Sequence, residues 1–245
     1  MPRTSSKPDY GIDAPGVVRS LLAIGALLLL LGGFVAKVQF GPVILVLGPM
    51  AIGCGSFLVT EGILMIVYSK WGKFQHRDRM LNMVDWKGNE CALDVGTGRG
   101  LLMIGAAKKL TTGKAVGIDI WSAKDLSGNS LEGTLRNAEL EGVRDRVEVQ
   151  NGDATAMKFP DDSFDVVLSN LCIHNIPGKK ARDKACSEIV RVLKPGGRAI
   201  ISDFIHTAQY VKAFQAAGAR ASRTGPDFVF TFPWLRIVDV RKPSL

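Results

Sequence analysis

Two long stretches near the amino terminus have almost no charged residues, and they limit what this chain can fold into more than any other feature. Residues 20–36 contain no charged side chain, and residues 38–69 contain only Glu61. An α-helix needs about 20 apolar residues to cross the hydrocarbon core of a bilayer. Two core helices of a soluble domain would instead show a polar face, which both stretches lack. We therefore predict two transmembrane helices, Val17–Ala36 and Pro42–Tyr68, that form a hairpin.

The flanking charges predict how this hairpin, residues 17–69, is oriented. Basic side chains lie before the first span and after the second, at Arg3, Lys7, Arg19, Lys70, Lys73, Arg77 and Arg79. The short connection of residues 37–41 carries only Lys37. Because basic flanks stay on the cytoplasmic side, we expect residues 1–16 to be a cytoplasmic tail. The chain after residue 69 is expected to be cytoplasmic as well.

A cleaved signal peptide is the alternative interpretation of the first apolar stretch. Phe34 departs from the small-residue pattern that would precede cleavage at Ala36, and a second span follows directly. We therefore expect the hairpin to be retained.

The predicted spans contain small residues and one carboxylate. Small side chains that would let the two helices pack closely occur at Gly25, Gly32, Gly33, Ala51 and Gly55. Glu61 lies about two turns from the cytoplasmic end of its span. Its carboxylate therefore either reaches the headgroup region or has a function within the membrane.

The remainder of the chain alternates between short apolar segments and longer amphipathic ones. A basic linker, residues 70–89, is expected to be helical and to lie near anionic headgroups. Strands are predicted at Glu90–Val95, Ala115–Ile120, Val147–Asn151, Asp165–Ser169 and Arg198–Asp203. Helices are predicted at Leu101–Leu110, Ser130–Glu141, Lys179–Leu193 and Ala208–Ala217. This alternation predicts an α/β domain over residues 90–245 with a parallel sheet. Residues Phe228–Val240 are expected to add terminal strands, with an antiparallel strand at the edge.

A glycine-rich loop follows the first predicted strand of this domain. It contains Gly96, Thr97, Gly98 and Gly100, which would form a tight turn at a helix N-terminus. A dinucleotide fingerprint would require a small residue at the next position, where this chain has Leu101. Asp94 precedes the first glycine by two residues, and its negative charge opposes a pyrophosphate. The loop therefore favours a cofactor with an ammonium group and a sulfonium over a dinucleotide.

Acidic residues also follow the next two strands. Asp119 lies nineteen residues after Gly100, about where an acid accepts the hydroxyls of an adenosine ribose. Ile120 or Trp121 could then lie against the adenine ring, and Asp153 could accept a hydrogen bond from an exocyclic amine. Each acid alone could be a helix cap or a turn residue. Three acids after three successive strands predict a single binding site.

The order of these motifs resembles that of a known family. The series comprises Asp94–Gly100, Asp119, Asp153, Lys158–Asn170 and Glu188–Gly197. It is similar to the motif series of class I S-adenosylmethionine-dependent methyltransferases, and in particular to the subgroup that includes quinone and sterol methyltransferases. The resemblance covers residues 90–203. It implies a Rossmann-like sheet of seven strands, mostly parallel with the last strand antiparallel, and S-adenosylmethionine as the cofactor.

The resemblance also implies the roles of individual residues. It assigns the methionine portion to Asp94 and the loop of residues 96–100, the ribose to Asp119, the adenine edge to Asp153 and Ala154, and the opening beside the methyl group to Asn170 and Leu171. The large lid common in this subgroup has no counterpart between Asp203 and the helix near Ala208. Residues 121–130, the linker helix and the membrane surface are therefore the candidates for covering the acceptor.

Methyl transfer from a sulfonium requires neither a protein nucleophile nor a metal, and we expect no metal site. The four cysteines lack a metal-ligand spacing and are expected to be free thiols. A base would help if the acceptor is a thiol, a phenol or an acidic carbon. The candidates are His174, Asp203 and His206, and a structural role is the alternative for each histidine.

The chain is basic, with 31 basic and 23 acidic residues and a net charge of +8. Such a charge is typical of proteins that bind nucleic acid or an anionic membrane. The hairpin makes the membrane the simpler partner, and a base-flipping motif is missing after the fourth strand. We therefore predict a membrane-anchored methyltransferase that acts on a small or lipid-like acceptor, with no nucleic acid partner. The alternatives are a soluble thiol or amine as acceptor, or an inactive cofactor-binding scaffold; the sequence does not decide the oligomeric state.

Overall fold

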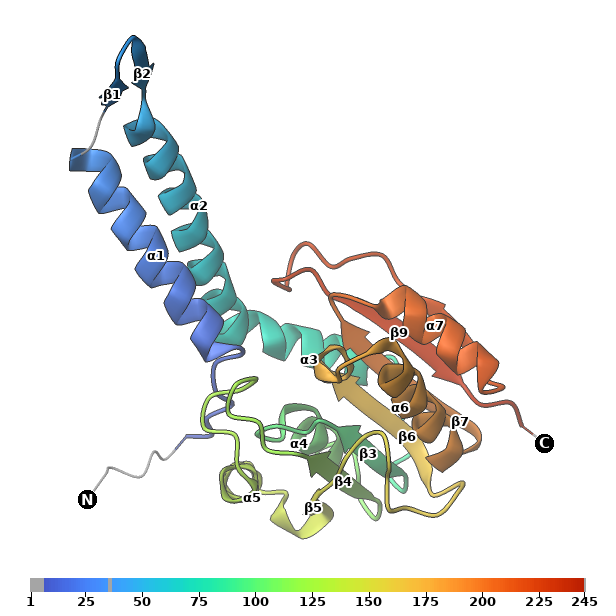
Figure 1. The fold of residues 1–245 in the computed structure, drawn as a ribbon. Coiled ribbons are helices and arrows are strands. Elements are labelled where there is room, and N and C mark those ends of the chain that lie inside the picture. Colours follow the sequence, from blue (N-terminus) through green and yellow to red (C-terminus); the bar gives the residue numbers. More distant parts are fainter. Residues whose placement is uncertain (1–6, 35–36, 245) are drawn as a thin grey trace.

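The computed structural model of the chain describes residues 7–34 and 37–244, and it consists of a helical hairpin joined to an α/β domain (Figure 1). The hairpin contains α1 (Pro15–Phe34) and α2 (Leu47–Val67). Two short antiparallel strands connect them, β1 (Val38–Phe40) and β2 (Val43–Leu45). The end of the predicted first span at Ala36 and residues 1–6 of the predicted tail lie outside the described residues.

The predicted start of the second span is wrong. Pro42 lies in the turn between β1 and β2, and α2 begins only at Leu47. Gly41 has a φ of +58°, a conformation that glycine adopts without steric cost in a tight turn. The residues on both sides are rich in valine, isoleucine and phenylalanine, which favour strands. The connection is therefore a β-hairpin.

Glycines bring α1 and α2 into close contact, as predicted from Gly25, Gly32 and Gly55. A Cβ atom at Gly25 would lie 2.9 Å from the carbonyl oxygen of Gly55. One at Gly32 would lie 2.9 Å from the carbonyl oxygen of Gly48. The prediction is wrong for Gly33, where a Cβ would meet no atom of the described residues within 4 Å. Backbone-to-backbone packing of this kind is typical of helix pairs in lipid.

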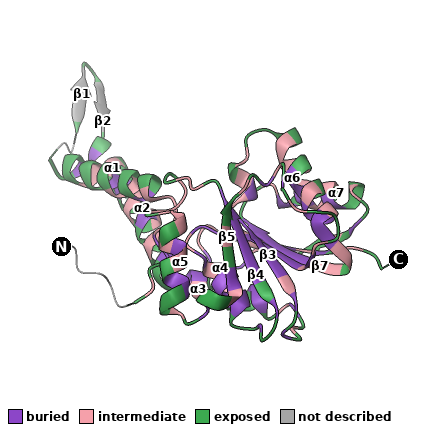
Figure 2. Ribbon diagram, turned by 90° about the horizontal axis from the view of Figure 1, so that it is seen from below, coloured by how far each residue is buried: buried purple, intermediate pink, exposed green. Residues whose placement is uncertain are grey.

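The outer surfaces of α1 and α2 are apolar and exposed. Leu30, Met50 and Phe57 are 61%, 68% and 63% exposed, respectively. Figure 2 shows both helices as mainly exposed, in contrast to the buried strands of the domain. Both helices are long and apolar enough to cross a membrane. Only 17% of the most apolar 18-residue stretch within residues 15–34 is buried, and only 11% of the one within residues 47–81. A core helix of a soluble protein would be mostly buried.

The second helix of the hairpin continues into the α/β domain. A π-helical turn, Tyr68–Gly72, follows α2 directly, and α3 (Lys73–Leu81) follows that turn. Tyr68, Lys73 and Leu81 are buried, because one side of this stretch packs against the domain. The hairpin and the domain are therefore connected by one helix without a flexible linker.

The domain contains a mixed sheet of seven strands, which confirms the predicted α/β fold. Its strands are β3 (Cys91–Val95), β4 (Lys114–Asp119), β5 (Val147–Asn151), β6 (Phe164–Asn170), β7 (Leu193–Asp203), β8 (Arg220–Arg223) and β9 (Arg236–Arg241). The spatial order is β5-β4-β3-β6-β7-β9-β8. The first five strands in this order are parallel. The strand order reverses between β3 and β6, which is where open α/β sheets bind their ligands.

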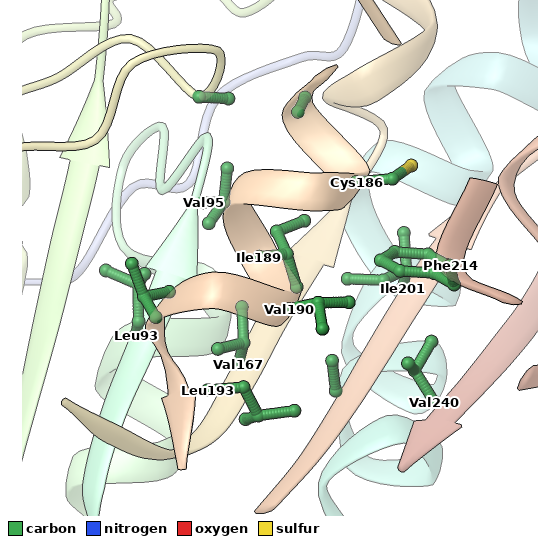
Figure 3. Close-up of a cluster of buried hydrophobic side chains, with 14 of the residues drawn as sticks. Leu93, Val95, Val167, Cys186, Ile189, Val190, Leu193, Ile201, Phe214 and Val240 are labelled. Atoms are coloured by element: carbon green, nitrogen blue, oxygen red, sulfur yellow. The ribbon is translucent and has the colours of Figure 1, made fainter. Parts of the chain in front are cut away.

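Helices cover both faces of this sheet. They are α4 (Leu101–Ala107), α5 (Leu131–Leu140), α6 (Lys179–Val192) and α7 (Thr207–Ala216), in addition to α3. Side chains from α3, α4 and α5 pack into one core cluster, and side chains from α6 and α7 pack into another. Figure 3 shows the second cluster, in which Ile189 and Phe214 lie against Val167 and Val240 of the sheet. Two apolar cores on opposite faces hold the central strands rigidly in place.

The predicted position of the antiparallel strand is wrong. The antiparallel strand β9 lies between β7 and β8, and the edge strand is β8. In β9, Ile237, Val238 and Val240 are all buried, as expected for a strand that has neighbours on both sides. The short β8 carries arginines at both ends, which suits an exposed edge. The segment from Phe228 to Leu235 forms a loop and not a strand.

Candidate active site

The glycine-rich loop lies at the carboxyl end of β3, where the sequence places it. Gly96, Gly98 and Gly100 have φ values of +74°, +55° and +86°, which favour glycine at all three positions. The amides of Gly96 and Thr97 both donate hydrogen bonds to the carbonyl oxygen of Ile118, at 2.9 and 3.0 Å. The loop is therefore anchored to the end of the neighbouring strand β4.

A residue that the sequence analysis did not assign to the site packs directly on this loop. A Cβ atom at Gly96 would collide with the side chain of Cys172, which follows β6. Burial raises the pKa of the Cys172 thiol, so this cysteine stays protonated. Its role is to fill space beneath the glycine loop. The sequence feature that could have identified Cys172 as a site residue is its position just after the fourth predicted strand.

Asp94 braces the loop from within the sheet. Its carboxylate is buried, and Oδ2 accepts hydrogen bonds from the Thr97 hydroxyl and the Met103 amide, both at 2.9 Å. Burial raises the pKa of this carboxyl group to about 7. The carboxylate thus joins the loop to the first turn of α4. A direct contact of Asp94 with a methionine moiety stays a prediction.

Asp119 joins the loop to the segment after β4. Its Oδ2 accepts a hydrogen bond from the Gly98 amide at 2.8 Å, and its Oδ1 accepts one from the Trp121 amide at 2.6 Å. Asn129 Nδ2 also donates to Oδ1, at 3.3 Å. The carboxylate lies within reach of whatever the glycine loop holds. It is only 8% exposed, which strengthens its electrostatic interactions with a bound ligand.

The predicted adenine-side residues are less closely joined to this centre. Ile120 is 73% exposed, whereas the Trp121 indole donates a hydrogen bond to the Asn151 side chain at the end of β5. Asp153 accepts hydrogen bonds from the Thr155 amide and hydroxyl, at 2.7 and 2.9 Å, so its carboxylate caps its own turn. Ala154 is buried beside it. The adenine contacts of these residues remain predictions.

Tyr68 is a second residue that the sequence analysis did not assign to the site. It lies in the π-helical turn after α2, and its side chain is buried. Its hydroxyl oxygen accepts a hydrogen bond from Asn170 Nδ2 at 3.5 Å, and Asn170 lies at the carboxyl end of β6. The other side-chain atom, Asn170 Oδ1, is buried without a partner among the described residues. The next residue, Leu171, has a φ of +53°. The predicted opening beside the methyl group therefore contains a buried acceptor atom that a ligand could engage.

His174 and Asp203 form a pair beside this opening. His174 Nδ1 lies 2.9 Å from Asp203 Oδ1, and the His174 amide donates a hydrogen bond to Asp203 Oδ2 at 3.1 Å. The Tyr210 hydroxyl donates to the same oxygen at 3.2 Å, and the carboxylate is fully buried. The His174 ring also packs edge-on against Phe204, with centroids 4.8 Å apart. Because Nδ1 faces the carboxylate, Nε2 is the ring nitrogen that remains for a proton transfer.

His206 is separate from this pair. It is the residue before α7 and has a φ of +61°. In the described parts of the chain, no hydrogen bond or ion pair joins its ring to His174 or Asp203. The geometry thus brings two of the three candidate bases together. No group of three or more side chains that could hold a metal ion occurs among the described residues.

The amino-terminal segment packs over the outer side of the glycine loop, although the sequence analysis treated it as a tail. We call residues 9–13 the strap. The Asp9 amide donates to Asn137 Oδ1 at 3.0 Å, and the Ile12 amide donates to the Ser127 hydroxyl at 2.7 Å. Lys73 Nζ donates to the carbonyl oxygens of Tyr10 and Gly11, at 2.7 and 2.8 Å. The strap and residues 121–130 are therefore in contact, and Lys73 of α3 holds the strap in place.

Comparison with known proteins connects this arrangement to methyl transfer. Residues 93–201 match the family described as "Methyltransferase domain". The chain is 33% identical over 132 residues to a demethylmenaquinone methyltransferase of Symbiobacterium thermophilum, which covers 54% of this chain and 48% of that protein. It is 34% identical over 124 residues to a sterol 4-C-methyltransferase of Caenorhabditis elegans, which covers 51% of this chain and 34% of that protein. The chain thus spans about half or less of the length of these relatives.

The fold is also that of a solved methyltransferase. A SAM-dependent methyltransferase from Aquifex aeolicus superposes with a TM-score of 0.54 at 19% identity, over 67% of this chain and 88% of that chain. At this identity the likeness concerns the fold alone. The family match and the relatives support a SAM-dependent methyltransferase with S-adenosylmethionine as its cofactor, and the solved structure shares its fold.

Proposed function

We propose that this chain is a membrane-anchored, S-adenosylmethionine-dependent methyltransferase that modifies a small, lipid-like acceptor at the cytoplasmic surface. One observation carries the proposal. Tyr68, at the end of an exposed apolar hairpin, lies in hydrogen-bond contact with Asn170 at the ligand-binding end of the sheet. The element suited to a bilayer and the element suited to the cofactor therefore meet at one place.

The residues around the glycine loop fit the proposed cofactor. Three glycines with positive φ leave the backbone accessible at the end of β3. Asp119, which is buried, provides a carboxylate for ribose hydroxyls. Asp94 behind the loop, whose pKa burial raises to about 7, adds negative charge near an ammonium or sulfonium group when it is ionised. A pyrophosphate would meet repulsion from both acids. S-adenosylmethionine, when bound, supplies an activated methyl group on its sulfonium.

The protein's contribution to the reaction is to position the acceptor and to remove a proton. Orientation of reactants alone can supply roughly 7 to 11 kcal/mol of the barrier reduction. Asp203 Oδ1 lies 2.9 Å from Nδ1 of His174, so the carboxylate would stabilise the imidazolium that forms when Nε2 takes a proton from the acceptor. The unpaired Asn170 Oδ1 offers a hydrogen-bond acceptor at the same opening. Cys172 remains protonated and takes no part.

Two further observations favour a lipid-like acceptor. The relatives include proteins named for demethylmenaquinone and for sterol substrates, both of which are lipid-like. The apolar sides of α1 and α2 are exposed along both helices. Large exposed apolar surfaces mark sites of interaction with a membrane or another protein. Burial of the hairpin in a bilayer raises the effective concentration of any acceptor dissolved there. The basic residues that flank the hairpin favour placing both termini and the domain in the cytoplasm.

The test is transfer of a labelled methyl group in membranes. Vesicles from cells with and without the protein receive S-adenosylmethionine labelled in its methyl group, and the organic extract and the aqueous phase are counted separately. We expect label in the organic extract only when the protein is present. Label confined to a water-soluble product would contradict the lipid-like acceptor. An absence of label in both phases, despite cofactor binding, would favour an inactive scaffold.

A further inference from the structure

The loop between β8 and β9 exposes a cluster of large apolar side chains that the proposed reaction does not use. We call residues 227–235 the aromatic loop. Phe228, Val229 and Trp234 are 63%, 76% and 52% exposed, and the Phe228 and Trp234 rings pack edge-on with centroids 4.9 Å apart. Large side chains exposed together in this way mark an interaction surface.

This loop is built rigidly, so the exposure of its aromatic rings is not a result of disorder. Asp227 Oδ1 accepts hydrogen bonds from the amides of Val229 and Phe230, at 2.9 and 3.1 Å. The Thr231 hydroxyl donates to the Asp227 carbonyl at 2.7 Å and accepts from the Leu235 amide at 2.8 Å. These bonds hold the apolar side chains pointing outward from a fixed backbone.

The aromatic loop is also attached to the end of the hairpin. The rings of Trp71 and Phe230 lie 5.7 Å apart. A Cβ atom at Gly72 would collide with the carbonyl oxygen of Phe230, so only glycine permits this approach. Arg79 in α3 donates to Asp227 Oδ2 at 2.8 Å. Figure 1 shows the loop, the orange-red segment before β9, reaching to where α2 passes into α3.

The composition around the loop matches the boundary between a bilayer and water. Trp71, whose ring packs against Phe230, is the chain neighbour of Lys70, an exposed residue that follows the apolar helix. Arg223 and Arg236 lie at the two ends of the strands that carry the loop. Aromatic rings gather at the headgroup level of membranes, and basic side chains near them attract anionic lipids.

We propose that the aromatic loop is a second site at which the protein contacts an anionic phospholipid bilayer. The loop inserts into the interfacial region of the same leaflet that the hairpin enters. This inference rests on the proposed membrane insertion of the hairpin, since the loop is continuous with the hairpin's cytoplasmic end. Tyr68 and Trp71 belong to one π-helical turn. The buried Tyr68 contacts Asn170, whereas the exposed Trp71 contacts Phe230 of the aromatic loop. The two contacts together fix the domain on the membrane, with the Asn170 opening near the lipid surface.

Photocrosslinking in vesicles tests this contact. A benzophenone amino acid replaces Val229 in the full-length protein, reconstituted in vesicles of phosphatidylcholine and phosphatidylglycerol. The control positions are Phe57, exposed in the middle of α2, and Lys109, exposed beyond the end of α4 in the connection that leads to the amino end of β4. We expect at least tenfold more lipid adduct at Val229 than at Lys109, and an abundant adduct at Phe57.

The possible results separate the loop contact from the hairpin. Adduct at Phe57 but not at Val229 would overturn the loop contact and leave the hairpin in the membrane. An absence of adduct at Phe57 would overturn the membrane insertion on which both proposals rest. A protein–protein adduct at Val229 would instead identify the loop as an interface between copies of the chain, and it would also overturn the lipid contact.

Tryptophan fluorescence provides a second measurement that needs no crosslinker. The emission of Trp234 is the difference between the fluorescence spectrum of the unchanged protein and that of the variant Trp234→Phe. This variant retains an aromatic ring against Phe228. In vesicles that contain brominated phosphatidylcholine, we expect this difference spectrum to lose more than half of its intensity. An unquenched spectrum with the red-shifted maximum of tryptophan in water would contradict insertion of the loop.

Discussion

The side chain of Asn170, at the end of a central strand, donates a hydrogen bond to the hydroxyl of Tyr68, at the end of the apolar hairpin. The two residues are 102 positions apart in the chain. The Tyr68 side chain is excluded from solvent, so this contact lies inside the protein and not on its surface. A change in how the hairpin sits in a membrane would therefore reach the proposed methyl-transfer site through one rigid helix.

Tyr68→Phe should slow methyl transfer without weakening cofactor binding. The substitution removes the hydroxyl that Asn170 Nδ2 contacts at 3.5 Å, and a hydrogen bond of this kind contributes about 1 kcal/mol. We expect transfer to fall about fivefold. A double-mutant cycle with Asn170→Ala isolates the coupling between the two side chains. Additive effects of the two substitutions would show that the contact has no role in transfer.

Asp119→Ala should weaken the binding of S-adenosylmethionine at least tenfold, which corresponds to about 1.4 kcal/mol. The carboxylate of Asp119 holds the Gly98 and Trp121 amides at the proposed ribose position. Isothermal titration measures the affinity, with a dinucleotide as the ligand that should not bind. Glu148→Gln is the matched control, because Glu148 pairs only with the exposed Lys114 in the described structure. Equal affinities of the unchanged protein and Asp119→Ala would remove this site assignment.

Asp94 should make the protein less stable as the pH rises. Burial raises the pKa of its carboxyl group from 3.8 to about 7 in the folded protein. The group therefore contributes stability below pH 4, and this contribution is lost as the pH rises through 7. Asp94→Asn can still accept the Thr97 and Met103 hydrogen bonds but does not titrate. We expect the melting temperature of Asp94→Asn, relative to that of the unchanged protein, to increase from pH 5 to pH 8.

A pH-independent difference between these two melting temperatures would contradict the raised pKa of Asp94. Other titrating groups cancel in this comparison. The buried His76, for example, has its pKa lowered to about 4 by desolvation in both proteins.

His174→Gln should slow methyl transfer on the order of 100-fold, because general-base catalysis typically contributes at least that factor. Cofactor affinity should be unchanged, since none of the hydrogen bonds of the glycine loop involves His174. Unchanged transfer in His174→Gln would show that His174 has only a structural role against Phe204.

Lys73→Met should release the strap from the domain. Lys73 Nζ is buried and donates to the carbonyl oxygens of Tyr10 and Gly11. Its burial lowers its pKa, and loss of the ammonium leaves both carbonyls without this partner. We expect hydrogen exchange in residues 8–14 to accelerate at least tenfold, measured by mass spectrometry. Lys70→Met, at an exposed position in the same helical stretch, serves as the control, and an equal acceleration there would show a general loss of stability.

Sequence patterns alone determined the α/β alternation and the place of the glycine-rich loop within it. Short apolar segments predict β3, β4, β6 and the carboxyl half of β7, because burial on both faces requires an apolar side chain at nearly every position. They do not predict β8, which has the sequence RASR. The glycine loop and Asp119 follow directly from their places after β3 and β4. Three of the glycines that contact the opposite helix of the hairpin, Gly25, Gly32 and Gly55, were likewise visible, because only small residues allow such close packing. Gly62, which contacts Leu22, was not predicted.

Only the tertiary structure decided which distant segments meet. The strand order at the edge depends on how β9 inserts between β7 and β8, and no local pattern distinguishes an inner strand from an edge strand in so short a segment. The strap and Tyr68 were predicted to be a tail and the end of a membrane span, because their contacts with Ser127 and Asn170 lie more than 100 residues away. Local periodicity reports which face of an element is buried, whereas the partner of that face is set by packing of the whole chain.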